Sequence, residues 1–179
     1  EDTPFGGWEQ ASGYVRSKLL GELVALSWQG DGLEVVIVKP TAPVGAGDAR
    51  PSATGRRLAA ALRGEVLPYP PGGINFAPVR DIAAGMLLAA ERGRPGATYI
   101  LGHRDGNLDL AAFLALVADV AGKPVFRPQD LSKFSGSPAA LTADPGRAIA
   151  ELGMPQSDLR AAFAEAVAWY GGANHVGAA

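Results

Sequence analysis

A tyrosine and a lysine lie one helical turn apart in the segment YVRSK at residues 14–18. Residues at i and i+4 of a helix share a face, so Tyr14 and Lys18 can serve one site. A free phenol has a pKa of about 10 and is a weak base at neutral pH. A cation close to Tyr14 would favour its phenolate and let it exchange a proton with a carbonyl or alcohol. This proton transfer is what a nicotinamide-dependent oxidoreductase needs. The alternative is a solvated pair on a surface helix.

The pair must be positioned by the elements around it, and these alternate between helix and strand. An apolar helical face continues from Lys18 to Leu26, and Pro40 opens a loop rich in Pro and Gly that we expect to run to about residue 53. The alternation predicts an α/β protein. The other expected elements are strands at 34–39, 66–69 and 98–101, helices at 55–63, 81–92 and 108–121, a helix that starts at Asp144-Pro145, and a last helix capped by Ser157.

The helix expected at 81–92 carries two further predictions. Asp81 is placed to cap its first turn, and we interpret this residue as structural. The helical spacing predicts that Ile82, Met86, Leu87 and Ala90 face the protein interior.

Composition narrows the class of protein. The chain has 179 residues, of which 47% are hydrophobic and 19% charged, so it can bury a core. The net charge of −2 gives no electrostatic reason to expect a nucleic-acid or membrane partner. No cysteine is present, and His103 and His175 have no further ligand at metal-binding spacing, so we expect no metal site. With no signal peptide or membrane-spanning segment in the sequence, a cytoplasmic location is expected.

Four motifs in order resemble those of the extended short-chain dehydrogenase/reductase superfamily, the NAD-dependent epimerase/dehydratase type. They are the Tyr14/Lys18 helix followed by an apolar strand and a Pro/Gly loop, the segment NFAPVRDIA at 75–83, the segment RAIAELGMP at 147–155, and Trp169. Within that branch, segments 36–45 and 51–56 are similar to hopanoid-associated sugar epimerases and dihydroflavonol-reductase-like proteins.

The resemblance implies the C-terminal part of a Rossmann-type parallel sheet plus a small α/β substrate-binding lobe. Residues 1–53 would end the Rossmann domain, and 54–179 would form mainly the substrate lobe, with returning Rossmann elements around 75–101. No Gly-rich turn follows a strand here, so the N-terminal nucleotide-binding strands are expected to be absent, and the missing half to be another segment or chain.

The resemblance also implies roles for particular residues. Tyr14 would be the general acid/base, and Lys18 would hold a ribose hydroxyl and lower the pKa of Tyr14. The cofactor would be NAD or NADP, bound by Tyr14, Lys18 and the loop residues Pro40, Thr41 and Val44. A structural turn is the alternative for this loop. The Tyr/Lys helix would also be a possible homodimer face.

The substrate is expected to be a small molecule, with Arg56 and Asn75 as the candidate substrate-binding residues. A solvated helix face is the alternative for Arg56. Nucleotide-sugar epimerases of this branch carry an Arg before the segment at 75–83, and Gly73 to Phe76 includes none, which weakens that interpretation. A sugar epimerase and a carbonyl reductase both stay open. So does a non-catalytic cofactor-sensing or interaction module that kept the scaffold.

Overall fold

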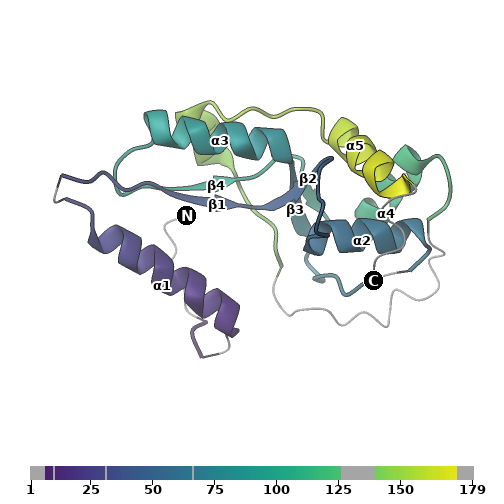
Figure 1. Cartoon of the computed structure of the whole chain (residues 1–179), viewed down its shortest axis with the longest axis horizontal. Helices are drawn as coiled ribbons and strands as arrows, with labels where there is room; N and C mark the ends of the chain where they lie inside the picture. Colours follow the sequence, from purple (N-terminus) through teal and green to yellow (C-terminus); the bar gives the residue numbers. More distant parts are fainter. Residues whose placement is uncertain (1–6, 10, 31, 66, 126–139, 173–179) are drawn as a thin grey trace.

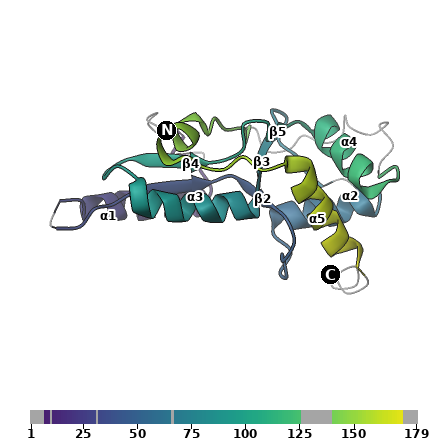
Figure 2. The ribbon, with the colours of Figure 1, turned by 90° about the horizontal axis from the view of Figure 1, so that it is seen from above.

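The computed structural model describes residues 7–9, 11–30, 32–65, 67–125 and 140–172. It is an elongated α/β molecule with α1 and α3 toward one end and α2, α4 and α5 toward the other (Figures 1 and 2). The elements are α1 (Gly13–Ser27), β1 (Ile37–Pro40), β2 (Ala42–Val44), α2 (Ala53–Leu62), β3 (Ile74–Pro78), α3 (Val79–Arg92), β4 (Thr98–Leu101), β5 (Asn107–Leu108), α4 (Leu110–Ala121), a π-helical turn η2 (Ala148–Leu152) and α5 (Leu159–Gly171).

The strands form two small sheets. β1 pairs in parallel with β4, with Ile37 opposite Thr98. β2 pairs in parallel with β3, and β3 pairs antiparallel with β5. The expected α/β class with parallel strands is therefore confirmed.

Two hydrophobic clusters hold the described elements together. One lies around β1, β4, α3 and η2, and its fully buried side chains include Tyr99 and Leu101. The other joins α2, α4 and α5 to β2 and β3. Its centre is aromatic, because Phe113 lies 5.5 Å from Phe76 and 6.1 Å from Phe163 between ring centroids.

Several expected elements are confirmed, and their differences from expectation are local. The strand at 98–101 and the helices near 55–63 and 108–121 form at or within two residues of the predicted limits. β1 begins three residues later than the expected strand at 34–39. The expected loop from residue 40 contains β2, because pairing with β3 makes a strand of it. Residues 67–69 are not a strand, and Val66 lies outside the described residues. Tyr69 is instead fixed by its side chain, whose hydroxyl donates to the carbonyl of Leu108.

The orientation of α3 differs from expectation. Ile82, Gly85 and Ala89 face the interior, whereas Met86 and Leu87 are 43% and 67% exposed. Gly85 packs so closely on β4 that a Cβ there would lie 3.1 Å from a methyl carbon of Leu101. This close approach of helix and strand fixes which stripe of α3 is buried.

Asp81 is structural, but it does not cap α3. Its carboxylate accepts hydrogen bonds of 2.7 Å from both the main-chain N–H and the hydroxyl of Ser157. Ser157 therefore does not cap the last helix. Asp158 does so, accepting from the N–H groups of Arg160 and Ala161. The contact between Asp81 and Ser157 instead ties the start of α3 to the segment that enters α5.

Helix α1 lies across the β1–β4 pair from α3 and contributes no buried residue (Figure 1). Its N-terminus is capped by Ser12, whose hydroxyl accepts from the N–H of Val15. An ion pair of 2.8 Å between Glu22 and Lys39 links α1 to β1. Leu23 and Val24 are 61% and 60% exposed, so the apolar face expected on this helix is largely uncovered.

Candidate active site

Tyr14 and Lys18 lie on one face of α1, as their spacing predicts. The Lys18 ammonium nitrogen is 5.6 Å from the centroid of the Tyr14 ring. Tyr14 is 72% exposed, so its hydroxyl is accessible to a ligand. The first turn of α1, which carries Tyr14, is the end of the helix nearer to α2 (Figure 1).

Two cavities meet at Tyr14. The first, of about 720 Å³, lies between α1 and β1 and is lined by Tyr14, Lys18, Glu22 and residues 36–40. The second, of about 600 Å³, lies between the end of β1, the start of α2 and residues 140–143. Tyr14, Lys39 and Pro40 line both. A group in either cavity can therefore approach the same phenol.

Of the three loop residues predicted to bind the cofactor, two line a cavity at Tyr14 and one is buried elsewhere. Pro40 lines both cavities, and Thr41 lines the second. The Thr41 hydroxyl donates to the carbonyl of Leu101 at 3.2 Å, so it also ties the loop to β4. Val44 is 3% exposed and packs in the second hydrophobic cluster, away from both cavities. The structure thus brings Pro40 and Thr41 near Tyr14, but not Val44.

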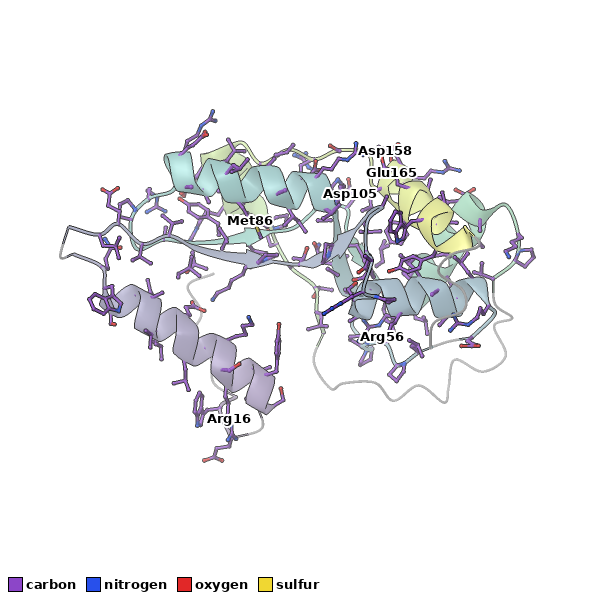
Figure 3. The ribbon with its side chains drawn as sticks, in the orientation of Figure 1. Arg16, Arg56, Met86, Asp105, Asp158 and Glu165 are labelled. Atoms are coloured by element: carbon purple, nitrogen blue, oxygen red, sulfur yellow. The ribbon has the colours of Figure 1, made fainter. Side chains whose placement is uncertain are left out.

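The two predicted substrate residues do not line the cavities at Tyr14. Arg56 is exposed on α2, and it donates to the carbonyl of Pro51 at 2.7 Å (Figure 3). Asn75 has no exposed surface. Its amide donates to Asn107 and to the carbonyl of His103, and it accepts from the N–H of His103. All of this hydrogen bonding is internal, because β3 turns Asn75 toward the loop after β4.

Arg57, and not Arg56, lines the second cavity. Arg57 was not among the predicted site residues, because two adjacent arginines on a short helix are equivalent in sequence until the packing of the helix distinguishes them. α2 buries Leu58 and Ala61 against the second cluster, which turns Arg57 toward the cavity. The amphipathic phase of residues 53–62 was the signal that could have separated the two.

A polar contact between distant parts of the chain fixes the start of α2. The Tyr170 hydroxyl donates to the Asp48 carboxylate at 2.6 Å. Ser52 donates to the same carboxylate through its N–H and its hydroxyl, and it caps α2 by accepting from the N–H of Gly55. A Cβ at Gly55 would collide with both Tyr170 and Asp48, so only glycine fits there.

The protonation states agree with this arrangement. Burial acts to raise the pKa of Asp48, but the hydrogen bonds from Tyr170 and Ser52 outweigh it and hold that pKa below its ordinary value. Burial, together with the bond to Asp48, raises the pKa of Tyr170. A neutral phenol therefore donates to a charged carboxylate at neutral pH.

Replacing Tyr170 with phenylalanine should lower the free energy of unfolding at pH 7 by about 1 to 2 kcal/mol, because it removes a hydrogen bond to a partly exposed carboxylate. A depressed folded pKa stabilises the protein above the unfolded pKa of about 4, and this stabilisation is lost as the pH falls through the folded value. Urea titrations should therefore show the stability difference between wild type and Tyr170→Phe narrowing as the pH falls below about 4. An equal gap at pH 7 and pH 3 would contradict this account.

Comparison with known proteins gives the family. Residues 1–102 match the model of the NAD-dependent epimerase/dehydratase family. The chain is 33% identical to a dihydroflavonol 4-reductase-like protein from Synechocystis sp., covering 88% of this chain and 54% of the relative. It is 31% identical to sterol demethylase protein B from Methylococcus capsulatus, and the match covers 91% of this chain and 58% of the relative. The crystal structure of a nucleoside-diphosphate-sugar epimerase from Pseudomonas aeruginosa superposes with a TM-score of 0.73 at 27% identity, covering 95% of this chain and 58% of that one.

The chain therefore belongs to the NAD-dependent epimerase/dehydratase family, within the extended short-chain dehydrogenases/reductases. It spans just over half the length of the curated relatives it matches. Among the described residues, no helix is long and apolar enough to cross a membrane. Over the same residues no group of three or more potential ligands could hold a metal ion. His175 lies outside the described part of the chain.

Proposed function

We propose that this chain is the catalytic and substrate-binding part of an NAD(P)-dependent oxidoreductase or epimerase that acts on a sugar or a small carbonyl or alcohol. The observation that carries the proposal is the position of Tyr14 where two cavities meet, with Lys18 beside it. Such a reaction requires a cofactor and a substrate to reach one proton-transferring group from two sides.

Each side chain has a distinct task in this proposal. Tyr14 gives a proton to the reacting oxygen of a carbonyl substrate, or takes it from an alcohol. Lys18, whose ammonium nitrogen lies 5.6 Å from the centroid of the Tyr14 ring, holds a hydroxyl of the cofactor. The nicotinamide, when bound, supplies the hydride chemistry. Lys18, Tyr14 and Pro40 would hold it, because they line the larger cavity, which offers room and hydrogen-bond donors.

The second cavity is the proposed substrate side. It is lined by Thr41, Ser52 and Thr54 together with apolar side chains, so it suits a ligand with hydroxyl or carbonyl groups on an apolar body. A nucleotide-sugar epimerase or dehydratase is a second candidate, favoured by the structural likeness to the Pseudomonas aeruginosa epimerase. Arg56, exposed at the start of α2, would be available to the diphosphate of such a substrate.

Titration with NADH and NADPH, followed by nicotinamide fluorescence, tests the proposal. The protein as encoded, with any sequence that precedes Glu1, should bind one of them with a Kd of micromolar order, and Lys18→Met should weaken that binding. The chain from Glu1 to Ala179 alone should bind far more weakly, because no Gly-rich turn for the pyrophosphate occurs in it.

The other outcomes are equally informative. Tight binding by the isolated chain would disprove the idea that the nucleotide site needs further sequence. No binding by either protein would disprove the oxidoreductase proposal and favour a non-catalytic module that kept the scaffold.

A further inference from the structure

Arg57 is half-buried and, among the described residues, its guanidinium has no acidic partner. By contrast, Arg63, Arg94 and Arg160 each form an ion pair with a carboxylate, at 3.1, 3.0 and 2.7 Å respectively. Within the described residues, Arg57 bonds only to main-chain carbonyls, those of Pro68 and Ala53, both at 3.2 Å. Its guanidinium carbon lies 6.0 Å from the centroid of the Tyr69 ring.

These contacts fix the guanidinium without neutralising it. Two of its five N–H groups are used, and the side chain is held between Tyr69 and the start of α2. Burial lowers the pKa of Arg57, and the charge of Arg56 lowers it further, although the group stays cationic at neutral pH. A half-buried guanidinium that lines a cavity and keeps free N–H groups can donate them to an anionic ligand there.

The cavity that Arg57 lines is short of negative charge. Its described lining includes two cations, Arg57 and Lys39, and no Asp or Glu. Lys39 is already paired with Glu22, so Arg57 is the cation left for a ligand. Tyr14 lines the same cavity, and the wall between them is largely apolar, with Ala42, Ile74, Ile100 and Leu141 contributing.

We infer that Arg57 determines specificity by binding an anionic group of the substrate, a carboxylate or a phosphate, while the oxygen that reacts lies at Tyr14. This inference rests on the proposed function and narrows its substrate class to hydroxy or keto compounds whose apolar body carries an anion. A guanidinium can hold either oxyanion through two parallel N–H bonds.

Calorimetry with matched ligand pairs tests this without requiring turnover. The pairs are 4-oxopentanoate with its methyl ester, and dihydroxyacetone phosphate with dihydroxyacetone. The wild-type protein as encoded should bind at least one anion about tenfold or more tightly than its neutral partner. Arg57→Gln should reduce the ratio of anion affinity to neutral-ligand affinity by about 10- to 100-fold, and Arg57→Lys should retain part of that ratio. The pair that shows the preference tells carboxylate from phosphate.

Three comparisons make the result specific. Arg63→Gln removes an exposed arginine at the C-terminal cap of α2 that lines neither cavity at Tyr14, so it should not change the preference. If Arg56→Gln removes the preference and Arg57→Gln does not, the wrong arginine has been assigned. Thermal unfolding of Arg57→Gln and Arg57→Lys shows whether either variant has lost its fold.

Failure of this inference can be told apart from failure of the proposed function. Equal binding of anion and neutral partner by wild type, or no binding of either pair, overturns the role of Arg57, whatever Tyr14 does. Anion binding that depends on Arg57, in a protein that binds neither NADH nor NADPH, would retain the anion site and overturn the oxidoreductase proposal.

Discussion

Replacing Tyr14 with phenylalanine should lower kcat by about 10²- to 10⁴-fold in the protein as encoded, because it removes the group proposed to transfer the proton. The ring and its contact with Lys18 would remain, so binding of NADH or NADPH should change little. A substrate is first selected from a panel of ketones, keto acids and sugars, and the rate is then followed by nicotinamide absorbance.

The control is the same chemical change at a tyrosine that the structure places elsewhere. Tyr99 is fully buried, its hydroxyl donates to Glu151 at 2.8 Å, and it lines neither of the cavities at Tyr14. Tyr99→Phe should destabilise the protein modestly and leave kcat unchanged below its unfolding temperature. If Tyr14→Phe keeps full activity, Tyr14 is not the acid/base.

Lys18 gives a second measure of the same mechanism. Because the lysine is proposed to hold a hydroxyl of the cofactor, Lys18→Met should raise the Kd for NADH or NADPH in the fluorescence titration. An unchanged Kd would remove Lys18 from the cofactor site.

Replacing Phe113 with alanine should lower the free energy of unfolding by about 3 to 5 kcal/mol, the largest stability effect expected among the described residues. Phe113 is 1% exposed and lies between Tyr69, Phe76 and Phe163, with ring centroids 5.4 to 6.1 Å apart across the group. Removal of its ring loses buried apolar area and aromatic contacts. It also leaves a cavity that the rigid neighbours can close only in part.

Urea unfolding followed by circular dichroism measures this effect. Leu87→Ala is the control, since Leu87 is 67% exposed on α3 and its truncation should change stability by no more than about 0.5 kcal/mol. A loss below about 1 kcal/mol for Phe113→Ala would mean that the cluster of α2, α4 and α5 repacks easily and does not fix the cavity wall formed by α2.

Features that depend on local pattern could be predicted from the amino-acid sequence. The strand at Thr98–Leu101 and the helix ending at Ala121 were predicted because apolar spacing and a following glycine act within a few residues. Tyr14 and Lys18 were predicted to share a face because helix geometry alone sets that relation. The family was identified for the same reason, since its motifs are short and contiguous.

The buried faces of those elements and their contacts with one another depend on how the elements pack in three dimensions. The residues buried on α3 follow from the close approach of Gly85 to Leu101. Arg57, and not Arg56, lines a cavity with Tyr14 because α2 docks through Leu58. Asp48 and Tyr170, which fix that helix, are far apart in the chain. Contacts of this kind depend on how packed elements fill space together, and no local periodicity or propensity encodes them.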